Sequence, residues 1–220
     1  SLPYESNSLS PNIRVFELFA DRSYNDQLFF RFGKHTVKWG VGYFWSPADV
    51  INVTSINPLD PEAQREGPIN LRLHVPIIGT QNNIWAYAIV PSGIQTQDLV
   101  PEDIAYAGKY EMLLGNTELG LGAFWQRDHA PKAMLTATGS VWRFNLFGEA
   151  VASWGSDKEF VTDVTTFKTE KNTKGLYFSC SVGGMYVDNT HKFNAIFQYF
   201  YNGEKGYSDS ERKTLIKDGR

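Results

Sequence analysis

Hydrophobic and polar residues alternate along most of this chain with the two-residue period of a β-strand. In the clearest run, residues 69–77, large aliphatic side chains share one face and Asn70, Arg72 and His74 lie on the other. The same alternation recurs over residues 12–21, 28–39, 84–90, 104–114, 117–127, 133–140, 144–154, 176–187 and 193–201. The pattern predicts about ten strands, each with one apolar and one polar face.

The connections between these strands alternate in length. Links after the first, third, fifth, seventh and ninth strands are tight, and Gly115-Asn116 is a two-residue hairpin signal. Links after the second, fourth and eighth strands are long, and the link after the sixth is intermediate. Outer-membrane barrels have this arrangement, with short periplasmic turns and longer external loops. We therefore expect an all-β fold over residues 1–220, an antiparallel up-and-down transmembrane β-barrel in a single domain.

The ends of the chain bear on how such a barrel closes. A transmembrane sheet must close, because unpaired backbone groups in hydrocarbon cost several kcal/mol each. If the tight turns are periplasmic, the first strand descends from outside and the tenth ends outside. Residues 203–220 form a polar tail or loop without a closing aromatic strand. We expect this sequence to be an internal part of a larger barrel, with at least one further strand on each side.

The longest connection follows Trp39-Gly40. Connections of this length are usually functional or disordered. Ser46-Pro47 and Asp60-Pro61 are good starts for short helical turns, and Gly67 is a good stop. Residues 46–67 are therefore predicted to form an ordered external loop with short helical turns, folded over or into the lumen. Its charged candidates for a pore constriction are Asp49, Asp60, Arg65 and Glu66.

Composition narrows the functional classes. The net charge is -3 and the charged residues are scattered, so a nucleic-acid partner is not expected. The longest apolar run, residues 84–90, is far shorter than the ~20 residues of a membrane-spanning helix. A single cysteine, Cys180, excludes an internal disulfide, and its position beside Phe178 and Val182 predicts a small apolar strand residue.

The polar faces of the predicted strands carry charges of both signs. In a barrel these side chains would line the lumen. They either neutralise one another in a network that fills the barrel, or they tune the selectivity of a transport path. The candidates are Arg14, Glu17, Asp21, Arg31, His35, Arg72, His74, Lys109, Glu111, Glu118, Arg143 and Glu149.

Aromatic residues, which make up 15% of the chain, gather near the predicted strand ends. Tryptophan and tyrosine concentrate at membrane–water interfaces, so an interfacial girdle is expected. The alternative is the ordinary core of a soluble sandwich. The candidates are Trp39, Tyr43, Trp45, Trp85, Tyr106, Trp125, Trp142 and Trp154, with Phe44 beside them.

Catalytic and metal-binding motifs do not occur in the sequence. It has no H-E-x-x-H zinc motif, no phosphate-cradling G-x-x-x-x-G-K-[ST], no G-x-S-x-G nucleophile elbow and no EF-hand loop. Asp60 and Glu62 could be proposed as an acid–base pair, but a helix that begins at Pro61 explains their spacing better. We expect neither an enzyme nor a bound metal or cofactor.

Several short motifs resemble a pattern in porin-like outer-membrane β-barrels of Gram-negative bacteria and spirochaetes. They are Arg31-x-Gly33-Lys34, Trp39-Gly40-x-Gly42, Pro47-x-Asp49, Asp60-Pro61 and Glu66-Gly67, and later Tyr199-x-Tyr201-Asn202-Gly203-Glu204 with Gly206-Tyr207. The resemblance covers about half of the chain. It implies an outer-membrane location and a pore function, and it supplies no substrate and no catalytic residues.

The expected function is therefore passive or selective passage of small polar solutes across the bacterial outer membrane, or a structural role at the cell surface. Its partner would be outer-membrane lipid, and the oligomeric state is left open. The alternative is a secreted soluble β-sandwich whose exposed aromatics stack on carbohydrate rings. An enzyme comes third.

Overall fold

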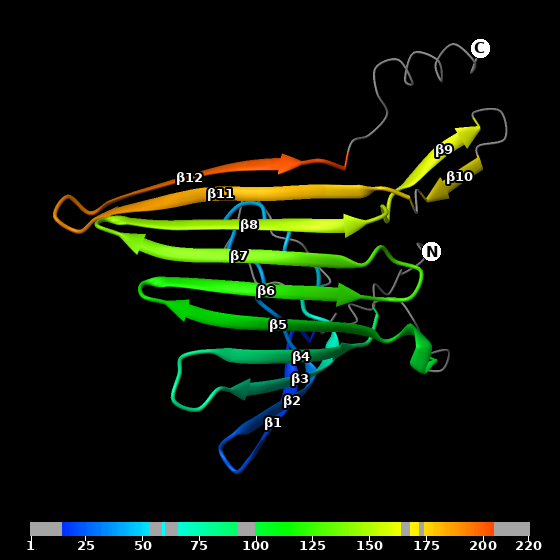
Figure 1. Ribbon diagram of the computed structural model, residues 1–220, viewed down its shortest axis with the longest axis horizontal. Coiled ribbons are helices and arrows are strands. Elements are labelled where there is room, and N and C mark those ends of the chain that lie inside the picture. The colour runs from blue at the N-terminus through cyan, green and yellow to red at the C-terminus, as the bar shows by residue number, and fades with distance from the viewer. Residues whose placement is uncertain are drawn as a thin grey trace, which may run out of the picture.

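The computed structural model describes residues 15–52, 59, 66–91, 100–163, 168–171 and 174–204, and side chains outside 159–170. It confirms the all-β expectation. Ten antiparallel strands follow one another in an up-and-down sheet in the order β1-β2-β3-β4-β5-β6-β7-β8-β11-β12 (Figure 1). The strands are β1 (Leu18–Tyr24), β2 (Leu28–Lys34), β3 (Ile69–Pro76), β4 (Asn83–Ile89), β5 (Ala105–Leu114), β6 (Thr117–Trp125), β7 (Lys132–Val141), β8 (Phe144–Trp154), β11 (Leu176–Asp188) and β12 (Phe193–Asn202).

Tight and long connections lie at opposite ends of the strands. At the end that we call the turn edge, three residues join β1 to β2, and Asn25 and Asp26 among them have φ of 50° and 51°, the left-handed conformation that tight hairpin turns use. The long connections lie at the other end, the loop edge, and include the 3-10 helix η1 (Pro101–Asp103). No helix in the described part of the chain is long and apolar enough to cross a membrane. The predicted alternation of connection lengths is thus present in the fold.

Three assignments need correction. The strand predicted over residues 12–21 lies further along the chain, because β1 begins at Leu18 and continues to Tyr24, and residues 15–17 precede it outside the strand. The strand predicted over residues 28–39 ends at Lys34 in the structure. Burial with a period of two persists beyond Lys34, where His35, Val37 and Trp39 are buried and Lys38 is exposed. These residues are not part of the sheet, and their side chains are buried against its face. The connection predicted between residues 155 and 174 contains a separate two-stranded sheet, formed by β9 (Glu159–Asp163) and β10 (Lys168–Lys171).

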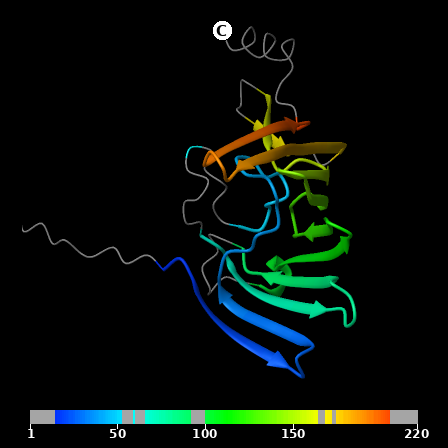
Figure 2. The same cartoon turned by 90° about the vertical axis from the view of Figure 1, so that its left-hand side faces the viewer.

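The sheet is curved, and residues 35–52, which we call the inner segment, lie on its concave side (Figure 2). Cross-strand register places Asp21, Arg31, Arg72 and Tyr87 side by side on this inner face. Further along the sheet the same face carries Thr136, Glu149 and Ser181. The inner face therefore combines the polar positions of the strands with the buried core.

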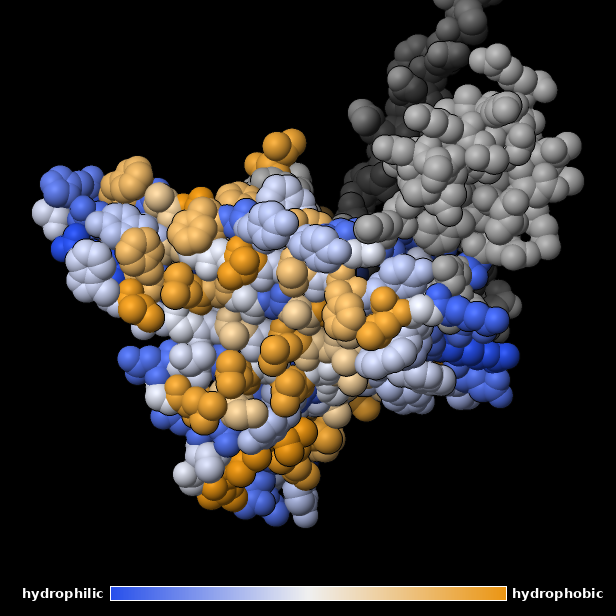
Figure 3. Space-filling model, turned by 45° about the horizontal axis from the view of Figure 1, so that its top comes forward, coloured by the Kyte–Doolittle hydropathy of each residue, from blue (hydrophilic) through white to orange (hydrophobic). Residues whose placement is uncertain are grey.

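The opposite, outer face is apolar, and no other element of the described residues covers it. Large hydrophobic side chains gather over the strands on the side seen in Figure 3. Alternation puts these exposed residues outward: Leu18, Phe32, Ile69, Leu71, Ile84, Tyr106, Leu114, Leu121, Trp125, Leu135, Val141, Leu146, Trp154, Leu176, Phe178, Val182, Phe193, Phe197, Tyr199 and Tyr201. Burying one such side chain is worth ~1.5–3 kcal/mol, so a face of this extent indicates an interaction surface.

The sheet has two open edges within the described residues. β1 pairs only with β2, and β12 pairs only with β11. The chain enters β1 and leaves β12 at the loop edge, so the two edge strands run in opposite directions. Both edges leave backbone donors and acceptors available for further antiparallel pairing.

Candidate functional site

Glu149 of β8 holds the inner segment against the sheet. The Val41 amide donates to Glu149 Oε2 at 2.9 Å, and the Ser46 hydroxyl donates to the same oxygen at 3.0 Å. Glu149 is 4% exposed. A buried carboxylate needs such donors, because burying a charge without partners costs far more than the bonds return. Glu149 is therefore the principal polar anchor of the segment.

Gln198 of β12 forms a second anchor. Its Oε1 accepts hydrogen bonds from the Tyr43 amide at 3.1 Å and the Phe44 amide at 2.8 Å. Its Nε2 donates to the Trp45 carbonyl and to the Ser181 hydroxyl. The side-chain amide thus uses both ends to satisfy backbone groups that have no strand neighbour. Lys109 adds a longer bond, from Nζ to the Trp39 carbonyl at 3.4 Å.

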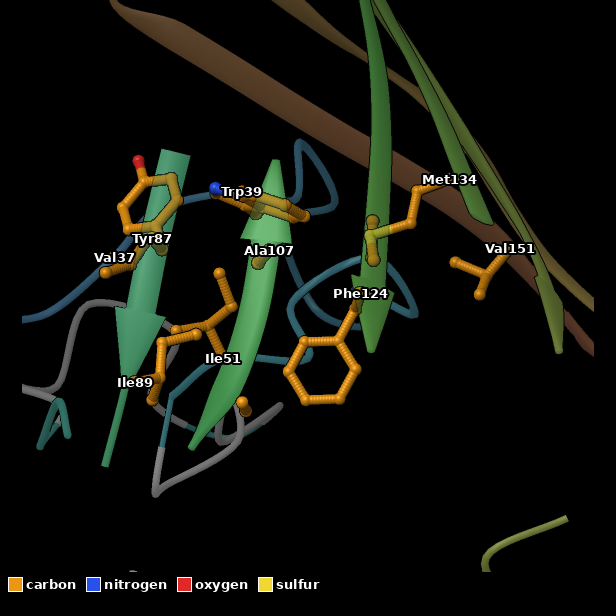
Figure 4. Close-up of a cluster of buried hydrophobic side chains, with 11 residues drawn as sticks. Val37, Trp39, Ile51, Tyr87, Ile89, Ala107, Phe124, Met134 and Val151 are labelled. Atoms are coloured by element: carbon orange, nitrogen blue, oxygen red, sulfur yellow. The ribbon is translucent and has the colours of Figure 1, made fainter. Parts of the chain in front are cut away.

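A hydrophobic cluster fills the space between the inner segment and the sheet (Figure 4). The segment contributes four buried side chains, and the inner face contributes seven more from β4 to β8. Trp39 is 2% exposed and meets Tyr87 edge to face at a centroid distance of 5.5 Å. The members of the cluster are Val37, Trp39, Ala48, Ile51, Tyr87, Ile89, Ala105, Ala107, Phe124, Met134 and Val151.

Asparagines fix both ends of the inner segment. At its start, Asn70 Nδ2 donates to the carbonyls of His35 at 3.3 Å and Pro68 at 3.1 Å. At its end, Asn52 pairs with Val37 in two directions, at 2.9 and 2.6 Å, and also donates to Asp49 Oδ1 at 2.7 Å. These bonds make residues 35–52 an ordered part of the fold.

Residues 46–52 contain a turn rather than the start of a helix. The Asp49 amide donates to the Ser46 carbonyl at 3.2 Å, and the Val50 amide donates to the Ala48 carbonyl at 3.0 Å. The pattern does not continue as a helix, because the Val37 amide and carbonyl bond to the Asn52 side chain and Ile51 is drawn into the core. The second predicted helical turn, at Asp60-Pro61, lies outside the described residues, as does the tail beyond residue 204.

The inner segment leaves a cavity of about 430 Å³ on the side toward the turn edge. Val41 and Tyr43 of the segment line it from one side. Glu118, Thr138 and Asn145 line it from the sheet. The inner face is therefore partly filled by the segment and partly open.

Glycine at position 42 is required by the close approach of the segment to its anchors. A Cβ there would lie 2.1 Å from the Trp45 carbonyl oxygen and 2.9 Å from Glu149 Oε1. We expect Gly42→Ala to lower the free energy of unfolding by ~1–3 kcal/mol, the usual cost of overpacking. Urea unfolding of the folded protein measures this loss. Gly108→Ala is the control, because the nearest atom to its Cβ is 3.7 Å away, and an equal effect of both changes would contradict this account.

Acid should weaken the start of the inner segment through His35. Burial, and then the positive charge of Arg72, lower the pKa of His35 from its usual 6.5. The unfolded chain therefore takes up a proton first as the pH falls, so stability decreases through 6.5 down to the folded pKa, by at most ~1.4 kcal/mol per pH unit. Urea unfolding at pH 7.5 and 5.5 should show this loss in the native protein and less of it in His35→Gln. Equal losses of stability in the native protein and in His35→Gln would show that His35 does not cause the pH dependence.

The structure brings most of the polar candidates to one face. His35 is buried at the edge of the inner face, and eight other candidates lie on that face. The eight are Asp21, Arg31, Arg72, His74, Lys109, Glu111, Glu118 and Glu149. Glu17 accepts a hydrogen bond from the Thr36 amide at 3.1 Å. Arg143 does not join them, because alternation ends at the two-residue turn that contains it, and its Nη1 lies 3.4 Å from the Tyr186 hydroxyl. Arg14 lies outside the described residues.

The charged candidates for a pore constriction do not lie together in the structure. Asp49 belongs to the inner segment. Glu66 forms an ion pair with Lys34 at the loop edge, away from the anchors. Asp60 and Arg65 fall in the part of the chain that the structure does not describe.

The aromatic candidates divide between the two faces. Tyr106, Trp125 and Trp154 are exposed on the outer face at the loop edge, and Trp142 is 82% exposed at the turn edge. Four others are on the inner side, contrary to the expected girdle. Trp39, Tyr43 and Trp45 belong to the inner segment, and Trp85 stacks on His74 at 3.8 Å because Ile84 and Ala86 take the outward positions of β4.

Sequence patterns missed the residues that hold the segment. Gln198 is recognisable only as a polar residue in an aromatic strand, and Ser181, Asn52 and Asn70 carry no signal of their own. Most of their partners are 15 to 155 residues away in the sequence, so the fold is needed to reveal them.

The side chains that the structure describes include no group of three metal-ligating residues placed to hold an ion. What the inner face offers is a set of charged and amide groups beside an ordered segment, without an assembled catalytic constellation among the residues described above. Comparison with protein-family models, curated proteins and solved structures gave no match for this chain.

Proposed function

We propose that this chain is a porin-like part of a bacterial outer-membrane β-barrel that gives small polar solutes a path across the membrane. In this proposal the outer face contacts lipid and the inner face borders the lumen. The inner segment is the constriction of the path. The observation that carries the proposal is the continuous apolar outer face, exposed on a sheet whose inner face is polar.

Strand length and edge aromatics support the membrane setting. A tilted transmembrane strand needs about 9–11 residues, and β5 to β8 have 10, 9, 10 and 11. Tyr106 and Trp125 stack at a centroid distance of 6.2 Å at the loop edge, on the lipid-facing side of the proposed barrel. Amphipathic rings are favoured at this depth because one side meets hydrocarbon and the polar atom meets water.

The inner segment supports the assignment of a constriction. A constriction must be held in a fixed position against the barrel wall, and here Glu149 and Gln198 bind the backbone of the segment from two strands. Lys38 of the segment is exposed, and Trp45 is 44% exposed while its ring stacks on Phe200 of β12 at a centroid distance of 6.4 Å. The open edges of β1 and β12 must pair with further strands in this proposal, from elsewhere in the protein or from another chain.

The carbohydrate-binding sandwich fits the fold less well. A sandwich covers one face of each sheet with a second sheet. Within the described ranges the second sheet is the small β9–β10 hairpin, whose strands follow β8 at the loop edge. The outer face would then remain apolar in water.

Partition and conductance test the proposal in two steps. The full-length protein should float with phospholipid vesicles and aggregate in detergent-free buffer. A protein that stays folded and monomeric in that buffer contradicts the membrane setting. Planar bilayers should then show discrete conductance steps, and their absence from an inserted, folded protein removes the solute path while leaving the fold.

A further inference from the structure

Two arginines lie side by side on the inner face. Arg31 of β2 and Arg72 of β3 are direct cross-strand neighbours. Like charges in this position repel, so the pair is costly unless anionic groups compensate it. Both side chains remain partly exposed on the inner side of the sheet.

Only one of the two arginines has an acidic partner among the residues described. Asp21 accepts bonds from Arg31 Nε at 2.7 Å and Arg31 Nη2 at 2.8 Å. Arg72 has no ion pair in this part of the chain, and its buried Nε has no hydrogen-bond partner there. The second nearby carboxylate, Glu17, is engaged with the Thr36 amide. Among the described residues, Arg72 thus has no direct acidic partner, and Asp21 acts on it only through its charge.

Aromatic rings flank the pair. The Arg31 guanidinium lies 3.8 Å from the centroid of Phe19, and the Arg72 guanidinium lies 5.4 Å from that of Trp85. Trp85 is held in turn by a bond from Nε1 to Glu111 at 2.6 Å. Ring contacts of this kind fix a guanidinium plane and leave its edge donors for a ligand.

We infer that Arg72, with Arg31, binds the carboxylate or phosphate of a small organic anion. A planar guanidinium donates two parallel hydrogen bonds to either group. The inference rests on the proposed function, because it makes this inner-face site the selectivity element of the solute path. The inference therefore predicts that the solute path favours anions.

Calorimetric titration of the full-length protein folded in detergent tests the site, with benzoate and inorganic phosphate as probes. Arg72→Gln should weaken both affinities about 10- to 100-fold, the range for a hydrogen bond to a charged group. Asp21→Asn should tighten them, because it releases Arg31 from its carboxylate. Arg22→Gln is the control, since it removes the same charge from the outer face and should change nothing.

The outcomes separate this inference from the proposed function. Binding that is undetectable, or that Arg72→Gln and Asp21→Asn leave unchanged, overturns the site even if the protein conducts. Binding with the predicted response supports the site even if bilayer conductance is absent. Added phosphatidylglycerol should not compete with benzoate; competition would mean that the site takes lipid headgroups and would overturn the assignment to dissolved anions.

Discussion

Replacing Glu149 with alanine should release the inner segment from the sheet. The change removes the acceptor for the Val41 amide and the Ser46 hydroxyl and leaves both half-buried donors without this partner. Losing these bonds should cost ~2–4 kcal/mol of stability. Because the loss is local, hydrogen exchange of the Val41 amide should accelerate about a hundredfold. If the segment is the constriction, single-channel conductance should increase as well.

Glu118→Ala provides the matched control. Glu118 is an exposed carboxylate on the same face, two strands away, so the charge change is the same and the anchor stays intact. It should leave the exchange rate of the Val41 amide within about twofold of the native value. Equal protection of that amide in Glu149→Ala and in the native protein would show that the hydrophobic cluster alone holds the segment.

The second large effect is expected on the outer face. Leu135 lies in the middle of β7 and is 46% exposed. Arginine at the bilayer midplane costs ~2–4 kcal/mol. Leu135→Arg should therefore reduce the fraction of protein that folds into vesicles at least tenfold, as measured by flotation and protease protection.

An arginine on the other face of the same strand is the control. Thr138 points inward and pairs with Glu118 across the strands, so Thr138→Arg gains an opposite charge nearby. It should insert as well as the native protein. Insertion of Leu135→Arg as efficient as that of Thr138→Arg would contradict a lipid-facing outer side.

Most of the sheet follows from local sequence. Alternation along residues such as Leu119, Leu121 and Trp125 fixes which side chains share a face, because a strand has a strict period of two. Turn residues and loop lengths then fix the order of neighbours, since consecutive strands joined by tight turns pair directly. The up-and-down topology needed nothing more.

Local sequence patterns did not predict where β2 ends or how the inner segment folds. Apolar side chains occupy even positions at Phe30 and Phe32 but odd positions at Val37 and Trp39, and the chain leaves the sheet between them, after Lys34. A strand and a segment packed flat on a sheet both have a period of two, so the period alone does not show where the strand ends. The anchors Glu149 and Gln198 act over more than a hundred residues, which local patterns do not contain.

The sequence predicted only in part that Arg31 and Arg72 are neighbours. Both were assigned to the polar face, but their adjacency depends on the register between β2 and β3, set across the long connection. The distribution of the tryptophans between the inner and outer faces was also predicted only in part. Trp85 and Trp125 both lie near strand ends, and only their positions in the alternation place one inward and the other outward.

Contact between the outer face and lipid is the claim on which the rest depends, and spin labels along β7 test it most directly. With Cys180 replaced by serine, single cysteines at Ala133, Leu135, Ala137, Thr138 and Ser140 carry the label in vesicles. Outward labels at 133, 135 and 137 should collide with dissolved oxygen and be shielded from a water-soluble nickel complex. Inward labels at 138 and 140 should show the reverse. Equal access of the nickel complex to both sets would place the outer face in water and contradict the membrane barrel.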